Sequence, residues 1–401
     1  MDRSSAVSLV VIAAAAVIAP VLAELLRRWR IPTVLFELLL GILIGPSIIG
    51  WVEVDGFIGG LSELGLAMLF FMAGYEIDFA RLKGAPLRLG VVGWIASLAL
   101  GLAAGAFLAF EGLVVSSLLI GLALTTTAIG TLLPMLRDRG LLGTRFGGFA
   151  VAAGAAGEFG PVLAITILLS AASPLQESLL LVLFVVLTVG IAVIATRPQP
   201  PEFIDVLQRH LTTASQLPVR ILLLLLTVMV LVAGALGLDN LLGAFAAGLI
   251  ARVALSPEQN AALTPRIEAI GFGFLIPVFF IVSGVQFDLR SLIASPVALA
   301  SLPLFLLLMF VVRGLPALAL YRKVLSGREC WAMALMQATA LPLLVVISQI
   351  GISEHEMSAE AAAVLVGAGM LSVLVFPLLA FSLLGREPEA SGATDSSALH
   401  R

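Results

Sequence analysis

Long apolar stretches alternate with short polar segments along almost the whole chain. The stretches lack the strict alternation of apolar and polar positions that marks the strands of a membrane barrel. A helix of about 20 apolar residues crosses a lipid bilayer, so each stretch predicts a membrane span. The pattern predicts an all-α polytopic membrane protein with about thirteen transmembrane helices, at residues 6–26, 32–50, 58–76, 89–109, 113–134, 146–170, 178–196, 219–237, 240–254, 269–287, 294–319, 330–350 and 361–384.

The positions of the basic residues support this count, because Lys and Arg collect in the cytoplasmic loops of membrane proteins. All but three of the 22 Lys and Arg residues fall in the loops after odd-numbered spans or in the C-terminal tail; the exceptions are Arg3, Arg290 and Arg313. We therefore expect a multi-pass protein of the inner (plasma) membrane, with its N-terminus outside and its C-terminus in the cytoplasm. Residues 1–23 could instead be a signal peptide, but their basic cluster follows the apolar run rather than preceding it.

Composition narrows the class of protein further. Hydrophobic residues make up 60% of the chain and charged residues 12%, whereas soluble domains are about 25% charged. The single cysteine excludes an internal disulfide, and the three histidines lie in predicted loops or the tail, which argues against a histidine-based metal site. A net charge of −3 gives no reason to expect nucleic acid as a partner. We expect the lipid bilayer as a partner and no cofactor.

The two halves of the chain resemble each other. Three pairs of segments match in the same order: "LLGILIGP" (39–46) with "LLGAFAAG" (241–248), "LFFMAGYEIDFARL" (69–82) with "VFFIVSGVQFDLRSL" (278–292), and "LTTTAIG" (124–130) with "MQATALP" (336–342). Asp78 and Asp288 lie 210 residues apart, and Thr127 and Thr339 lie 212 apart. Chance similarity between apolar segments is the alternative to a duplication.

A duplication divides the chain into related parts. We expect one transmembrane domain, residues 1–385, with repeat one at about 6–170, a linker helix at 178–196 and repeat two at about 219–384. Six helices and the linker helix precede the second copy, so the second copy starts on the opposite side of the membrane and is inverted. Inverted repeats are typical of transporters that bind their substrate near the middle of the membrane. The remaining segment, 386–401, is polar and is expected to be a short disordered cytoplasmic tail.

Three segments carry a family resemblance: "IPTVLFELLLGILIGP" (31–46), "LGLAMLFFMAGYEIDFARLK" (64–83) and "PVFFIVSGVQFDL" (277–289). They resemble the monovalent cation:proton antiporter family, whose similar branch includes bacterial sodium/proton exchangers and potassium-efflux antiporters. The resemblance implies a homodimer of 13-helix subunits. In each subunit, spans 1–3 and 8–10 would form a dimerising scaffold, and spans 4–6 and 11–13 a moving core. Spans 5 and 12 would be the two discontinuous helices that cross in this core.

The same resemblance implies an ion site. The family carries a pair of adjacent residues in the sixth span, usually Asp-Asp or Asn-Asp, and this position reads Gly157-Glu158 here. The first carboxylate or amide is missing, which puts the stoichiometry in doubt. The family also carries a Lys or Arg in span 11, and Arg313 occupies that place. Arg313 could be the charge partner of Glu158, or it could reach out to the cytoplasmic interface.

The residues themselves favour Glu158 as the site for proton and cation. A charged side chain in the middle of a bilayer is costly, and such residues commonly mark ion pathways. A carboxyl group that holds either a proton or a cation (Na⁺ or K⁺), but not both, couples the movements of the two. Further oxygen ligands could come from Thr126, Thr127, Gln337 and Thr339, although threonines also serve ordinary interhelical hydrogen bonds.

Three residues are expected to break helices around this site. Gly130, Pro161 and Pro342 would free backbone carbonyl groups in spans 5, 6 and 12, and Gly157 would let another group approach closely. Two further carboxylates lie near span ends. We expect Glu37 to be structural or to face the dimer partner, and Glu76 to anchor span 3 beside a basic loop.

The predicted function is a secondary active antiporter that exchanges Na⁺ or K⁺ for H⁺, with electroneutral exchange favoured because there is one carboxylate. The alternative is a cation channel or a sensor-like membrane protein of the same fold. We expect no enzymatic activity. An intramembrane protease would need a catalytic or metal-binding motif, and a nucleotide-driven pump would need a phosphate-binding loop; the sequence has neither. A solute symporter would need a larger polar pocket than these residues suggest.

Overall fold

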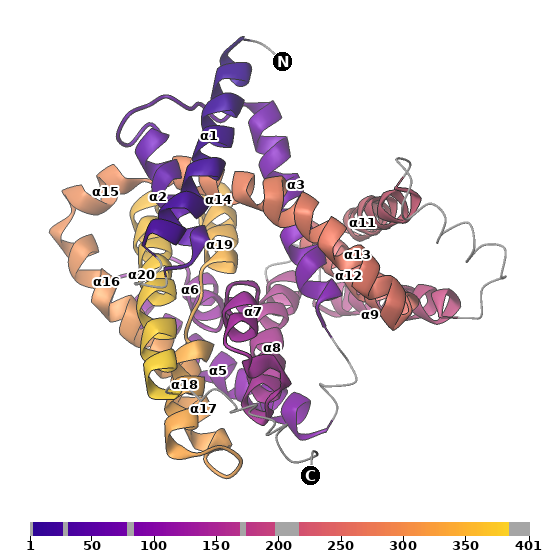
Figure 1. The fold of residues 1–401 in the computed structure, drawn as a ribbon. Helices are drawn as coiled ribbons and strands as arrows, with labels where there is room; N and C mark the ends of the chain where they lie inside the picture. The colour runs from indigo at the N-terminus through magenta and orange to yellow at the C-terminus, as the bar shows by residue number, and fades with distance from the viewer. Residues whose placement is uncertain (1–2, 27–30, 78–83, 169–173, 197–215, 385–401) are drawn as a thin grey trace, which may run out of the picture.

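The computed structural model describes residues 3–26, 31–77, 84–168, 174–196 and 216–384. All regular structure in these residues is helical, as the apolar pattern predicts (Figure 1). Within these described ranges, nine helical runs are long and apolar enough to cross a membrane, and four shorter apolar helices accompany them. These thirteen correspond one by one to the expected spans. The expected tail at 386–401 and Asp78 lie outside the described residues.

The helices follow one another without strands in the described part of the chain. The first seven spans correspond to α1 (Arg3–Leu25), α2 (Thr33–Ile44), α3 (Gly56–Tyr75), α5 (Ala85–Phe110), α6 (Ser117–Leu124) with α7 (Ile129–Asp138), α8 (Arg145–Leu168) and α9 (Pro174–Ala195). The last six correspond to α11 (Leu217–Ala235), α12 (Asn240–Ala254), α13 (Pro257–Ile270) with α14 (Ile276–Val285), α16 (Pro296–Met309) with α17 (Leu315–Tyr321), α18 (Gly327–Gln337) with α19 (Pro342–Ser353), and α20 (Ala359–Leu384). The short helix α15 (Leu289–Ala294) precedes α16.

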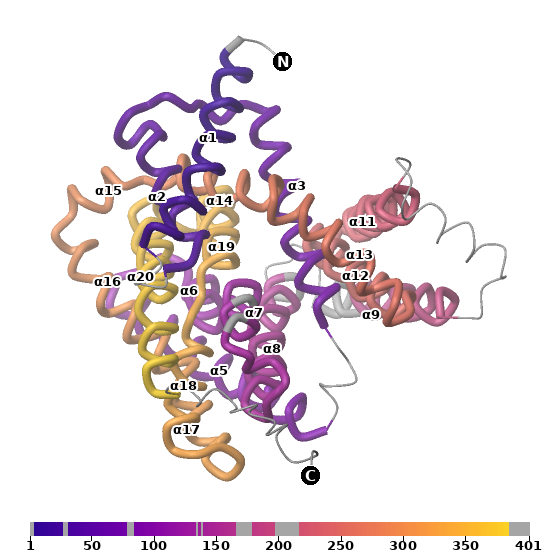
Figure 2. Tube along the Cα trace, viewed as in Figure 1, coloured from indigo at the N-terminus to yellow at the C-terminus, as the bar shows by residue number. Residues whose placement is uncertain are grey.

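The helices pack in two groups. One group contains α1–α3 and α11–α14, and the other contains α5–α8 and α16–α20. These groups are the scaffold and the core that the family resemblance predicts, and we use those names for them. Figure 2 shows that α20 of the core lies beside α2 of the scaffold, although the two helices are more than 300 residues apart in sequence.

Glycines bring scaffold helices close together at positions related by the internal repeat. A Cβ atom on Gly74 in α3 would lie 2.3 Å from the carbonyl oxygen of Phe245 in α12. A Cβ atom on Gly284 in α14, 210 residues later, would lie 2.2 Å from the carbonyl oxygen of Leu38 in α2. Both halves of the chain therefore use a glycine at the same place for the same kind of close helix contact, which supports the duplication.

Two spans are interrupted midway. Residues 125–128 separate α6 from α7, and residues 338–341 separate α18 from α19. Pro342 begins α19, where its missing N–H costs no helical hydrogen bond. Gly130, in contrast, does not form the other break, because it is the second residue of α7. The break precedes it, where the hydroxyl groups of Thr125 and Thr126 donate back to the carbonyl groups of Leu122 and Ala123.

Pro161 does not break its helix either, because α8 continues through it. A proline inside a helix removes the hydrogen bond to the carbonyl group four residues earlier. That carbonyl belongs to Gly157, and it accepts a hydrogen bond from the backbone N–H of Thr127 instead, at 2.9 Å. The freed carbonyl predicted from the sequence is therefore used, and it ties the unwound segment of span 5 to α8.

Candidate functional site

The two unwound segments contact each other inside the core. The backbone N–H of Ala128 donates to the carbonyl oxygen of Thr339 at 2.7 Å, and the hydroxyl of Thr127 donates to the carbonyl oxygen of Gln337 at 2.5 Å. Figure 1 shows α6, α7 and α19 near the centre of the molecule. Each broken helix therefore satisfies some of its free backbone groups with the other, as irregular backbone inside a membrane must.

Arg313 lies at this crossing. It belongs to η4 (Phe310–Gly314), a π-helical turn between α16 and α17, and its side chain is only 4% exposed. Its Nε donates to the hydroxyl of Thr127 at 2.9 Å and to the carbonyl of Gln337 at 3.3 Å. Its terminal nitrogens donate to Ser97 Oγ at 3.3 Å, to the carbonyl of Ala153 at 3.3 Å and to Gln337 Oε1 at 2.6 Å.

These hydrogen bonds stabilise the buried guanidinium charge without a carboxylate partner among the described residues. The carbonyl of Gln337 ends α18, so the charge lies at the negative end of a helix dipole. Arg313 and Glu158 form no ion pair within 4.0 Å, although both lie in the described part of the chain. Arg313 also does not extend to an interface, since its side chain is buried. The pairing with Glu158 expected from the sequence is therefore not formed, because neutral oxygen atoms surround the guanidinium instead.

Gly157 makes room for this arrangement. A Cβ atom on Gly157 would lie 2.2 Å from Arg313 Nη2 and 2.7 Å from the hydroxyl oxygen of Thr127. Both distances are far below van der Waals contact, so a larger residue would collide with the guanidinium group. The close approach predicted for Gly157 is thus the approach of an arginine side chain. The position where the related family carries Asp or Asn is occupied in space by Arg313.

Glu158 is the buried carboxylate of the core. It lies in α8, is 2% exposed, and lies near the backbone N–H groups of Ile129 and Gly130 at the start of α7. The N-terminus of a helix carries a partial positive charge that favours an anion. The second carboxyl oxygen, Oε2, is buried and has no hydrogen-bond partner. That oxygen is free to carry a proton or to coordinate a cation.

The other predicted ligands divide between the two charged residues. Thr127, Gly157 and Gln337 lie around Arg313, whereas Gly130 lies at Glu158. Thr126 and Thr339 form hydrogen bonds with carbonyl groups of their own helices, those of Ala123 and Leu335. The described structure thus places no predicted side-chain ligand in a hydrogen bond with Glu158.

Two contributors to the site were missed in the sequence. Ser97 bonds to Arg313, and it is the only hydroxyl-bearing residue of the apolar helix α5, which is a signal that could have identified it. The N–H groups of Ile129 and Gly130 have no side-chain signature, so only the position of the helix break reveals them.

A cavity of about 1300 Å³ extends from charged residues at the ends of odd-numbered spans, such as Glu24, Glu76 and Arg137, to the start of α7. Its walls come from both groups: α1, α2, α13 and α14 of the scaffold, and α7 and α20 of the core. Gly130 and Thr131 line the cavity, and Glu158 itself does not. The cavity therefore reaches the start of α7, near Glu158. The charged residues that line it are Glu24, Glu37, Glu76, Arg137, Arg139 and Glu268.

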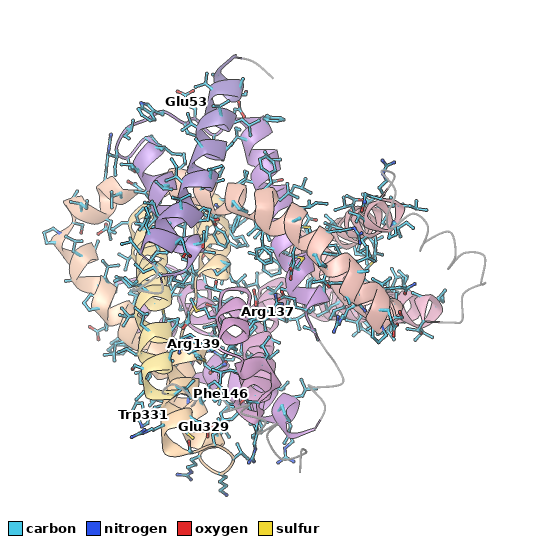
Figure 3. The ribbon with its side chains drawn as sticks, viewed as in Figure 1. Glu53, Arg137, Arg139, Phe146, Glu329 and Trp331 are labelled. Carbon is cyan, nitrogen blue, oxygen red and sulfur yellow. The ribbon has the colours of Figure 1, made fainter. Side chains whose placement is uncertain are left out.

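Matching contacts between core and scaffold lie at the two ends of the molecule. Arg137, near the end of α7, lies 3.7 Å from Glu76 after α3 and 3.3 Å from Glu268 in α13. Figure 3 shows Arg137 at the junction of these helices. Gln349 in α19 follows Arg137 by 212 residues, and it donates a hydrogen bond of 3.0 Å to Gln286 after α14. The expected anchoring of Glu76 beside a basic residue is thus found, and its repeat counterpart uses two neutral amides.

Comparison with known proteins identifies the family. Residues 12–384 match the family described as "Sodium/hydrogen exchanger, transmembrane". The Bacillus subtilis protein YjbQ, named as a candidate Na⁺/H⁺ antiporter, is 28% identical over 97% of this chain, which spans 65% of that protein. A Na⁺/H⁺ antiporter of Enterococcus hirae is 26% identical over 88% of this chain and 92% of its own length.

The fold is also found among solved structures. A sodium proton antiporter from Methanocaldococcus jannaschii is 18% identical, with a TM-score of 0.63 over 96% of this chain and 100% of that one. This similarity is evidence for the fold, and the match to residues 12–384 is evidence for the family. The chain is a multi-pass membrane protein that belongs to the sodium/hydrogen exchanger family.

Proposed function

We propose that this chain is a secondary active antiporter that exchanges Na⁺ for H⁺, with Glu158 binding the two ions alternately. The observation that carries the proposal is the buried Glu158 carboxyl, whose Oε2 has no partner in the described structure. An ionised carboxylate in such a place is costly unless something neutralises it. Since Arg313 directs its hydrogen bonds to neutral oxygen atoms and forms no ion pair with Glu158 within the described residues, a proton or a cation can serve as the neutralising partner of Glu158.

Competition for this one group couples the two ions. When a cation binds the carboxylate the proton must leave, and when the proton returns the cation must leave. Thr127, Gln337 and Arg313 hold the two broken helices around the site. The oxygen atoms of Thr126 and Thr339 lie in the neighbouring unwound segments and become ligands only if their intrahelical hydrogen bonds are exchanged. One carboxylate gives one-for-one, electroneutral exchange.

The cavity gives the proposal a direction. If the basic loops are cytoplasmic, the cavity opens to the cytoplasm, the N-terminus lies outside, and the structure is the inward-facing state in a plasma membrane. Movement of the core against the scaffold would then carry Glu158 to the outer face. The scaffolds of two subunits would form a homodimer and stay fixed, while the core of each subunit moves against its scaffold.

The proposal is tested with purified protein in liposomes containing a pH-sensitive dye. Wild-type protein should move protons when Na⁺ is added, and Glu158→Gln should abolish this movement while keeping the thermal stability of the wild type. The matched control is Glu354→Gln, at an exposed carboxylate in the loop after α19, which should behave as the wild type. Proton movement by Glu158→Gln on addition of Na⁺ would refute the assignment of the site.

Two further measurements separate the alternatives. A panel of Na⁺, K⁺ and Li⁺ in the same assay decides which cation is exchanged. A membrane-potential dye should stay silent during turnover if exchange is electroneutral. Cation current without proton movement would instead identify a channel and would refute the proposed exchange.

A further inference from the structure

Glu37 is a second buried carboxylate that the proposed exchange does not yet use. It lies on α2 of the scaffold, its side chain is 5% exposed, and it lines the cavity that ends at Gly130. It forms neither a hydrogen bond nor an ion pair within the described part of the chain. A structural carboxylate at such a depth would ordinarily have hydrogen-bond partners. The sequence-based expectation of a structural or dimer-facing role therefore does not explain its position in the cavity wall.

The position of Glu37 along the cavity is intermediate. Glu76, Arg137 and Glu268 form the charged cluster at the cavity mouth, and Gly130 lies at its inner end. Gly130 and Arg137 are seven residues apart on α7, which places them about 10 Å apart along its axis at 1.5 Å per residue. Glu37 lies about 6 Å along α2 from its first residue by the same measure. The residues at the start of α2, from Ile31 to Val34, line the same cavity, so Glu37 lies on the wall of the path that a cation would follow from the charged cluster to Gly130.

The scaffold holds Glu37 in place. Gly41, one turn further along α2, packs so closely on α14 that a Cβ atom there would lie 2.1 Å from the carbonyl oxygen of Ile281. Glu37 is therefore fixed to the part of the protein that does not carry Glu158. It can serve ions only at the face to which this cavity opens.

We infer that Glu37 is an access-site carboxylate that attracts the monovalent cation from the cavity and passes it to Glu158. This inference rests on the proposed function. It adds a second residue that sets cation affinity, and it acts on one face of the membrane only. Glu158 remains the group at which cation and proton compete, whereas Glu37 raises the local cation concentration in the cavity.

The test compares the two faces. In everted and right-side-out vesicles, Glu37→Gln should raise the apparent KM for Na⁺ about tenfold at the cavity face, as expected for removing a nearby charge in a partly desolvated path. The KM at the opposite face and the maximal rate at saturating Na⁺ should stay within about twofold of the wild type. Glu37→Asp, which keeps the charge, should stay close to the wild type, and Glu354→Gln should change neither face.

A second variant keeps the inference testable if Glu37→Gln folds poorly. The only native cysteine, Cys330, is buried, so Glu37→Cys can be made in a Cys330→Ala background. An anionic methanethiosulfonate added at the cavity face should restore the low KM of the parent, and a neutral reagent should not. Equal KM shifts at both faces, no shift at all, or restoration by the neutral reagent would overturn the inference. Exchange that is absent from the wild type would instead refute the proposed function itself.

Discussion

Gly157→Ala is the sharpest probe of the crossing, because it adds one methyl group where the structure leaves no room. The new Cβ would lie 2.2 Å from Arg313 Nη2, so the guanidinium group must move. Nη2 donates to Gln337 Oε1 at 2.6 Å and to the carbonyl of Ala153 at 3.3 Å. We expect the substitution to break both hydrogen bonds and to destabilise the core.

The size of the effect follows from these contacts. A hydrogen bond to a charged group contributes about 1.5–3 kcal/mol, so the loss of two costs about 3 kcal/mol or more. Alanine is favoured over glycine inside a helix by about 1 kcal/mol, which offsets part of the loss. The net destabilisation should be about 2 kcal/mol or more. Thermal unfolding of the purified protein in detergent, followed by tryptophan fluorescence, measures it.

Gly148→Ala is the matched control in the same helix. A Cβ atom on Gly148 meets no other atom within 4 Å, so this variant should be as stable as the wild type or slightly more stable. A double-mutant cycle adds the specific test: in an Arg313→Gln background, Gly157→Ala should cost less, because the nearer of the two colliding groups is gone and only the hydroxyl of Thr127 remains. Equal unfolding temperatures for Gly157→Ala and Gly148→Ala would refute the proposed packing of Arg313 against α8.

Two further predictions concern the scaffold and its loops. Gly248→Ala should lower the unfolding temperature more than Gly190→Ala does. A Cβ on Gly248 would lie 2.1 Å from the backbone carbonyl oxygen of Phe71, whereas one on Gly190 would meet nothing within 4 Å. Similar unfolding temperatures for the two variants would contradict the close packing of α3 on α12. Asp288 accepts hydrogen bonds from the hydroxyl and backbone N–H of Ser291, which lower its pKa below the ordinary value of 3.8. Its charge therefore stabilises the folded state above that pH, and the stability advantage of the wild type over Asp288→Asn, measured by thermal unfolding, should shrink as the pH falls below 3.8; a difference that stays constant down to acid pH would exclude this source.

Local chemistry made much of the fold predictable. The spans follow from apolar length, and Pro342 marks the start of α19 because a proline fits only the first turn of a helix. The free carbonyl of Gly157 was predictable from Pro161 for the same kind of reason. Gly130 suggested a helix break at the wrong position, because a glycine is compatible with a break but does not cause one. These features depend on a few neighbouring residues, which a sequence displays directly.

The partners of the charged groups were not predictable in the same way. Arg313 and Glu158 are of opposite charge and share one region, so pairing was the simplest expectation. Ser97 of α5, Thr127 of the unwound segment, Ala153 of α8 and Gln337 of α18 instead offer Arg313 five neutral acceptor atoms, and the start of α7 lies near Glu158. Which side of each helix faces which neighbour depends largely on contacts between residues far apart in the sequence, such as the 160, 186 and 216 positions that separate Arg313 from Ala153, Thr127 and Ser97. A single sequence does not display such contacts. The position of Glu37 in the cavity wall was not predictable for the same reason.

The two contacts between core and scaffold differ in chemistry, since Arg137 forms ion pairs and Gln349 forms a neutral hydrogen bond, and this difference makes their response to salt unequal. Dissolved ions screen the attraction of Arg137 for Glu76 and Glu268, but they hardly weaken the amide hydrogen bond between Gln349 and Gln286. A high salt concentration would therefore weaken the ion pairs of Arg137 and leave the hydrogen bond between Gln349 and Gln286 nearly unchanged. If the two halves are inverted repeats, a high salt concentration on one side of the membrane would therefore act on the protein differently from the same concentration on the other side.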